Sequence, residues 1–121
     1  SAKSPNYLIS SYRWVKKARE REPEPVVEIH PETAARYGIA DGDEVRIETK
    51  YGAIVQKALI TDIVDPRVVS AAIGWWFPEG DPARQYDWDK ANFNVLTSVD
   101  KLGKEYGTPN LKNIGCRIAK A

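Results

Sequence analysis

The chain has only one histidine and one cysteine with which to build a nucleophilic or metal centre. A nucleophile needs an adjacent base, and a catalytic metal needs about three protein ligands. His30 stands directly before Pro31 at the expected start of a helix, where its imidazole can cap the free backbone N–H groups. Cys116, beside Gly115 and Arg117 on an apparent strand, is expected to be a small core residue. The sequence therefore predicts no catalytic residue and no metal ligand.

Two segments do have the residue types of a binding site. They read Gly74-Trp75-Trp76-Phe77-Pro78 and Asn92-Phe93-Asn94-Val95-Leu96-Thr97. Adjacent tryptophans at a strand end can simply cover one end of a barrel, and that structural role is the commoner one. Asparagine, however, offers a donor and an acceptor on one short side chain, and glycine lets the backbone approach a planar ligand closely. The combination indicates a binding surface.

The elements that must position these segments are clearest over residues 26–62. A β-branched strand is expected at 26–29, followed by a short helix that begins at Pro31 and ends at Gly38, where a left-handed cap is favoured. Apolar and charged residues then alternate over 45–49, as in a half-buried strand, and a turn leads into a second strand over 53–60. This order of strand, helix and hairpin is typical of very few barrels.

The remainder of the chain is expected to add short strands and loops. Short apolar runs predict strands at 7–9, 68–72 and 114–119, and the charged segment 16–24 predicts a solvated stretch with at most a helical turn. Residues 78–90 mix Gly, Pro, Asp and aromatic residues without a period, which indicates a long ordered loop. Many short strands and little helix imply a mainly β, closed or nearly closed barrel.

Length and composition set further limits. A chain of 121 residues fits one domain, and 18 basic against 17 acidic residues give no overall field to attract nucleic acid or an anionic membrane. No apolar run approaches the roughly 18 residues of a membrane span. We expect a soluble domain, cytoplasmic or periplasmic. Ser1 in place of an initiator methionine, and the absence of any Met, suggest a segment of a larger protein.

The run HPETAARYGIADGDEVRIETKYG, followed by VVSAAIGWW and NFNVLT, resembles the C-terminal domain of the dimethyl-sulfoxide-reductase family of molybdopterin oxidoreductases. The resemblance covers residues 7–118 and is most specific over 26–76. It implies a double-psi β-barrel of the aspartate-decarboxylase-like type. It also implies that the domain helps to bind molybdopterin guanine dinucleotide with molybdenum or tungsten, while another domain supplies the metal ligand. The domain would not catalyse alone, and the substrate cannot be read from it.

The resemblance also implies which residues contact the cofactor. Asn94, Leu96 and Thr97 match a family stretch that faces it, and a two-residue offset would make Asn92 the contact instead. The paired aromatic segment contributes Gly74, Trp75 and Trp76. The closing loop before the last strand contributes Tyr106, Gly107 and Asn110.

Ser10, Ser11 and Arg13 match a small polar loop that carries an arginine in the family. Arg13 could pair in a bidentate manner with a pyrophosphate, although a surface salt bridge is an equal alternative. The chain departs from the family over residues 16–24, which are short and lack the usual polar pattern. The implied partners are the remaining domains of the same large subunit and an iron–sulfur electron-transfer subunit, although no cluster-binding cysteine pattern is present in this chain.

A second interpretation is a double-psi barrel that serves only as a protein-interaction module, since a fold alone does not decide function. The cofactor hypothesis requires Gly74, Asn94 and Thr97 to converge on one concave end of the barrel. A self-processing decarboxylase on the same barrel would need a Gly-Ser pair, and the chain has none.

Overall fold

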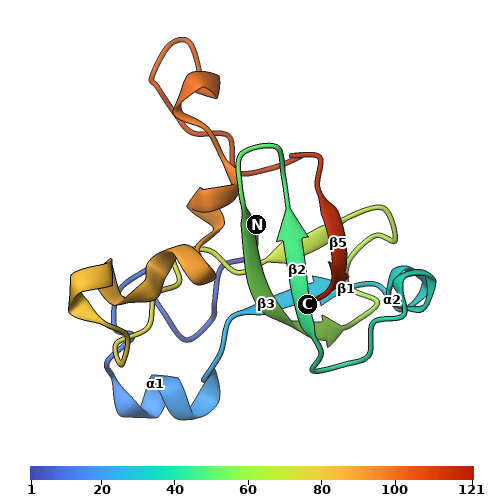
Figure 1. The fold of residues 1–121 in the computed structure, drawn as a ribbon, viewed down its shortest axis with the longest axis horizontal. Coiled ribbons are helices and arrows are strands. Elements are labelled where there is room, and N and C mark those ends of the chain that lie inside the picture. The colour runs from blue at the N-terminus through green and yellow to red at the C-terminus, as the bar shows by residue number, and fades with distance from the viewer.

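A computed structural model describes residues 1–121 with the exception of the side chain of Lys101. Its main feature is a curled five-stranded sheet (Figure 1). The strand order is β4-β1-β3-β2-β5, so β4 and β5 form the two edges. β1 pairs in parallel with β3, and the other neighbouring pairs are antiparallel. The strands are β1 (Val26–Ile29), β2 (Glu44–Glu48), β3 (Ala53–Ile60), β4 (Val69–Ala71) and β5 (Arg117–Lys120).

The elements expected over residues 26–62 are confirmed. Helix α2 (Pro31–Tyr37) begins with proline, and the His30 side chain caps it by accepting a hydrogen bond from the Glu32 N–H. Gly38 ends the helix with a φ of 65°, the left-handed conformation that glycine adopts without a steric penalty. In β2 the residues alternate strictly between exposed and buried, which is the period that the sequence predicts.

Three expectations about the chain ends are wrong. Residues 7–9 do not form a strand, because the chain turns sharply there and Leu8 bridges to Ser11 across Ile9, whose φ is 55°. The last strand begins at Arg117, three residues later than expected, so Cys116 precedes it. Cys116 is exposed and is not a core residue.

Most of the apolar burial lies inside the curl of the sheet. The main cluster takes alternate residues from the strands, among them Val27, Ile47 and Ile54, and is covered by α2 and by Phe93 and Leu96. A second, smaller cluster lies beyond it and contains Tyr7, Ala72, Trp75 and Ala91. Loops and short helices, not strands, enclose this second cluster.

Short helices complete the chain on the side of the sheet away from α2 (Figure 1). α1 (Lys16–Arg21) has no buried residue, as its charged sequence predicts. Three 3₁₀ helices follow β4, namely η1 (Pro82–Lys90), η2 (Phe93–Leu96) and η3 (Val99–Lys101). Within η1, residues 85–87 all have left-handed φ angles of 51–59°, so the segment is two turns joined by a kink.

Candidate functional site

Three loops that are distant in sequence meet at the end of the sheet opposite α2 (Figure 1). The Trp76 indole Nε1 donates to the Ser10 carbonyl at 2.7 Å, which joins the first loop to the segment after β4. The Asn92 side-chain Nδ2 donates to the Trp75 carbonyl at 2.9 Å, which joins the same segment to η2. The structure therefore brings together the segments around Ser10, Trp75 and Asn92 that the sequence singled out separately.

Arg13 lies at the centre of this junction and is only 1% exposed. Its guanidinium carbon lies 4.0 Å from the centre of the Tyr7 ring and 3.7 Å from that of the Trp75 ring. Nη2 donates to the carbonyls of Ile9 and Ile73 at 3.0 and 3.4 Å. Desolvation by burial lowers the pKa of Arg13. In this arrangement the guanidinium stacks between two rings and ties the first loop to the segment after β4.

The remaining nitrogens of Arg13, Nε and Nη1, are buried and find no hydrogen-bond partner among the described residues. A buried polar group of this kind ordinarily costs stability. Arg13 is buried and forms no ion pair among the described residues, so the alternative of a surface salt bridge is wrong, and contact between Arg13 and a pyrophosphate stays a prediction.

Gly74 lets the first loop approach the segment after β4 closely. Its φ is 66°, and a Cβ added there would lie 2.7 Å from Ile9 Cγ2 and 2.8 Å from the Ile9 carbonyl carbon. Ile9 and Tyr12 themselves have positive φ angles of 55° and 69°. Non-glycine residues rarely adopt such angles unless the surrounding structure holds them, and they are concentrated at functional sites.

Asn92 and Asn94 have different roles. Asn92 is buried, and besides its bond to Trp75 its Oδ1 accepts from the Asn94 N–H at 3.0 Å, which caps η2. Asn94 is exposed, and its carbonyl accepts from the Thr97 hydroxyl at 2.9 Å. Both polar atoms of the Asn92 amide form hydrogen bonds within the protein. Of these two asparagines, Asn94 is therefore the one whose side chain is available to a ligand.

Thr97 lines a shallow hollow of about 450 Å³ between the β2–β3 turn and the C-terminal loop. Asn110 lines the same hollow, together with the residues Thr49, Lys50, Tyr51, Ser98, Ile114 and Gly115. Gly74 and Asn94 are not among its lining residues. The cofactor hypothesis requires Gly74, Asn94 and Thr97 on one concave end. Hydrogen bonds of Asn92 and within η2 connect the segments that hold these residues, but the three residues do not line one hollow.

The closing loop separates its predicted residues. Gly107 has a φ of 62° and lies in a turn that is closed by its N–H bond to the Gly103 carbonyl and by a bridge between Leu102 and Pro109. Tyr106 is 88% exposed at this turn, which projects from the rest of the protein (Figure 1). The structure groups Asn110 with Thr97, but it does not bring Tyr106 to the other candidate residues.

Trp75 and Trp76 also differ. Trp75 belongs to the second apolar cluster, so the structural role that adjacent tryptophans commonly have applies to it. Trp76 is half-buried and meets Trp14 and Tyr86 with ring centres 6.0 and 5.4 Å apart. Trp14 and Tyr86 are exposed, so the edge of this junction is an aromatic surface.

Gln56 is a positioning residue that the sequence analysis missed. Its side chain is 2% exposed in β3, where Nε2 donates to the carbonyls of Ala72 and Ala91 at 3.0 and 2.8 Å. Its Oε1 accepts from the Ala72 N–H at 3.0 Å. The alternation of the strand could have predicted this buried glutamine, because Gln56 stands between Ile54 and Ala58 at an inward position.

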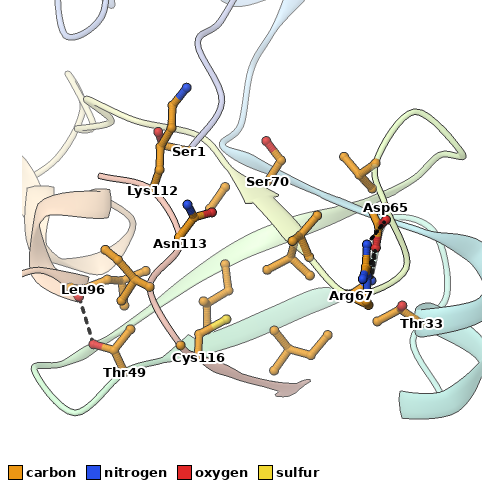
Figure 2. Close-up of a pocket in the computed structure, with 18 of the residues that line it drawn as sticks. Ser1, Thr33, Thr49, Asp65, Arg67, Ser70, Leu96, Lys112, Asn113 and Cys116 are labelled. Carbon is orange, nitrogen blue, oxygen red and sulfur yellow. Dashed lines mark hydrogen bonds and ion pairs between the residues drawn. The ribbon is translucent and has the colours of Figure 1, made fainter. Parts of the chain in front are cut away.

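A second cavity, about 670 Å³, lies elsewhere, between the edge strand β4 and the chain that leads into β5 (Figure 2). Its walls contain core residues, among them Ile47, Phe93 and Ile118, and the exposed Cys116. Although the residue as a whole is exposed, partial desolvation of its thiol at the cavity wall raises the pKa of Cys116. Leu96 is the one predicted site residue among the residues that line this cavity.

Asp65 and Arg67 form an ion pair at the rim of the same cavity. The guanidinium of Arg67 donates to both carboxylate oxygens at 2.9 Å, and these bonds lower the pKa of Asp65 to about 2. No group of three or more His, Cys, Asp or Glu residues suited to hold a metal ion occurs among the described residues. Within the same part of the chain, no helix is long and apolar enough to cross a membrane.

Comparison with known proteins identifies relatives that match most of this chain. Residues 1–115 match the family described as the Molydopterin dinucleotide binding domain. The dopamine dehydroxylase of Eggerthella lenta is 38% identical over 117 residues, which are 97% of this chain and 11% of that protein. The dimethyl sulfoxide/trimethylamine N-oxide reductase of Rhodobacter capsulatus is 33% identical over 88 residues, which are 73% of this chain and 10% of that protein.

A solved structure has the same fold. Acetylene hydratase from Pelobacter acetylenicus superimposes on all of this chain with a TM-score of 0.91 and 26% sequence identity, and the match covers 18% of that protein. This chain therefore spans between a tenth and a fifth of the length of these relatives.

Proposed function

This chain belongs to the molydopterin dinucleotide binding domain family, and from that membership we propose that it covers part of a molybdopterin guanine dinucleotide that carries molybdenum or tungsten. The domain would act within the large subunit of an oxidoreductase, of which residues 1–121 would be the C-terminal piece. We also propose that its curled sheet is part of a double-psi β-barrel. The other domains of the subunit would supply the metal ligand, and an iron–sulfur subunit would be the electron-transfer partner.

The family match over residues 1–115 is the observation that carries this proposal. It includes every candidate contact residue, from Ser10 to Asn110. The geometry of the site is a supporting argument, because hydrogen bonds through Asn92 connect the segment after β4 to η2.

The residues present fit an anionic, hydrogen-bonding group. The hollow beside Thr97 combines the Lys50 ammonium with the hydroxyls of Thr97 and Ser98 and the amide of Asn110. Ammonium groups bind phosphate as point charges, and amides can hydrogen-bond the edge of a guanine or pterin ring. The exposed Asn94 would add an amide from η2, and the metal–dithiolene centre of the cofactor would supply the redox chemistry. The residues of this chain would bind and orient the cofactor.

The direct test uses the complete reading frame that contains this segment. The purified protein should contain molybdenum or tungsten, measured by elemental mass spectrometry, and should release guanine nucleotide after acid hydrolysis. A complete protein that folds and contains neither would contradict the proposal, and the interaction-module interpretation would then be the better one.

Paired variants test the hollow itself. Thr97→Val removes a hydroxyl from the hollow, whereas Thr108→Val removes one from the exposed projecting loop. We expect Thr97→Val to bind the nucleotide roughly five- to tenfold more weakly, as the loss of about one hydrogen bond implies, and to release it correspondingly more readily on dilution. Thr108→Val should bind it as tightly as the unsubstituted protein does. Equal affinity in both variants would remove Thr97 from the binding site.

A further inference from the structure

We propose that Arg13 is a positioning residue, which holds two candidate binding loops against each other and does not itself touch the cofactor. This role deepens the proposed function and rests on it only for the identity of the ligand that the loops bind. Direct contact between Arg13 and a pyrophosphate is the alternative that the experiment must separate from it. The evidence is the burial of the guanidinium and the residues that its donors reach.

Arg13 presents almost no surface to a ligand. Its side chain is 1% exposed in this chain, and the remaining domains of a larger subunit could only cover it further. The guanidinium lies over the rings of Tyr7 and Trp75, which are also buried and meet at 82° with their centres 5.7 Å apart. These two rings form a corner that covers the cation and offsets part of the cost of burying it. A ligand could reach the guanidinium only if part of this packing moved.

The hydrogen bonds of Arg13 hold the backbone on both sides of the junction. Nη2 donates to the carbonyls of Ile9 and Ile73. Ile9 directly precedes Ser10, and Ile73 directly precedes Gly74. One guanidinium therefore fixes the neighbours of two candidate contact residues, one in each loop.

The first loop needs such support, because its backbone is strained. Ile9 and Tyr12 have positive φ angles, which non-glycine residues keep only where the surrounding structure holds them. Arg13 bonds the carbonyl of Ile9 and directly follows Tyr12 in the chain. The conformation that presents Ser10 and Ser11 between these two positions therefore depends on the buried guanidinium.

Arg13→Lys in the complete polypeptide separates the two roles. Lysine keeps the positive charge and binds phosphate as a point charge, but it lacks the planar fork that bonds two carbonyls while it stacks on a ring. Hydrogen–deuterium exchange is measured on protein produced without the cofactor. We expect the amides of residues 8–14 and 74–77 to exchange roughly tenfold faster in the variant, as the loss of about one hydrogen bond and the stacking implies. The loaded variant should also release nucleotide more readily on dilution.

Arg21→Lys is the matched control, because Arg21 is an exposed arginine of α1. It should change neither the exchange of these loops nor the release of nucleotide. Unchanged loop exchange in cofactor-free Arg13→Lys would overturn the proposal, since a residue that only contacts the cofactor acts only when the cofactor is bound. Metal and nucleotide analysis of the unsubstituted protein reads the proposed function separately from this exchange result.

A second pair of variants decides the question if Arg13→Lys also speeds exchange in β1 and β3 and so destabilises the whole domain. Tyr7→Leu removes one ring of the corner and keeps the guanidinium. Tyr7→Phe, its control, keeps the ring and removes only the hydroxyl that donates to the Glu22 carbonyl at 2.9 Å. Faster exchange of residues 8–14 in Tyr7→Leu alone would support the positioning role. Equal exchange in the two variants would overturn it.

Discussion

Gln56 shows how one side chain can connect a sheet to the loops of a binding surface. Its amide makes three hydrogen bonds at an inward position of β3, two to the backbone of Ala72 and one to that of Ala91. These residues precede the segments of Trp75 and Asn92, which carry the candidate contacts. The position of both segments therefore depends on a polar group that could not itself touch a ligand at the surface.

We expect Gln56→Leu to lower the free energy of unfolding by about 2 kcal/mol, because it leaves the Ala91 carbonyl buried without its side-chain partner. Chemical denaturation measures this change. Lys57→Leu, at the half-exposed position next to it, is the control and should change stability by less than about 0.5 kcal/mol. A Gln56→Leu variant as stable as the control would show that the amide is dispensable for the fold.

The Asp65–Arg67 pair makes a prediction about pH. The pKa of Asp65 is lowered from 3.8 to about 2, mainly by the side-chain hydrogen bonds from Arg67. Because the folded pKa lies below the unfolded one, the pair stabilises the fold above the unfolded pKa, and this contribution is lost as the pH falls toward 2. Arg67→Gln should return the pKa of Asp65 toward 3.8, as measured by NMR titration of its carboxyl group.

Arg46→Gln provides the matched control for this titration, since Arg46 is also exposed but pairs with Glu48. It should leave the pKa of Asp65 near 2. An unchanged Asp65 titration in Arg67→Gln would mean that the pair does not persist in solution.

At the scale of elements, the sequence predicts structure that depends on neighbouring residues, but not structure that depends on contacts between distant residues. Helix α2 is predicted because its proline start and Gly38 cap act within the helix itself. The sharp turn at Ile9 is not, because its positive φ is held by the close approach of Gly74, which is distant in sequence. The burial of Arg13 between Tyr7 and Trp75 has the same origin. The candidate segments were therefore predictable, but their contacts with one another were not.

The contact between the Ile9 turn and the segment after β4 gives a prediction with an internal control. Gly74 and Gly107 both have positive φ angles, but a Cβ would collide with the Ile9 backbone only at Gly74, since no atom lies within 4 Å at Gly107. Gly107→Ala should cost about 1 kcal/mol of stability through backbone strain alone. Gly74→Ala should cost about 3 kcal/mol, because overpacking adds to the strain. Thermal or chemical denaturation of the two variants provides the comparison.

Equal losses in these two variants would show that the first loop moves aside at little cost. A larger loss at Gly74 would show that the loop holding Ser10 and Arg13 is fixed against the segment after β4 before any ligand binds. A preformed surface of this kind lowers the ordering cost of binding.

For the whole molecule, the two apolar clusters suggest two levels of stability. The main cluster lies within the hydrogen-bonded sheet, whereas the second is enclosed by loops and short helices that carry the candidate contacts. Regions with few strand hydrogen bonds open locally at lower free energy than a sheet core does. A ligand that contacts the loops should therefore protect them far more than it protects the sheet.

Hydrogen–deuterium exchange of the complete protein with and without its cofactor can test this division. We expect cofactor removal to speed exchange by at least roughly tenfold in residues 8–14, 74–77 and 92–97, because these amides would lose the free energy of ligand binding. Amides in β1 and β3, which are paired on both sides, should change little. The projecting loop around Tyr106 discriminates further, since protection there would place it on the cofactor despite its separation from the other candidates. A uniform change across sheet and loops would indicate global destabilisation, and it would contradict a binding site formed by these loops.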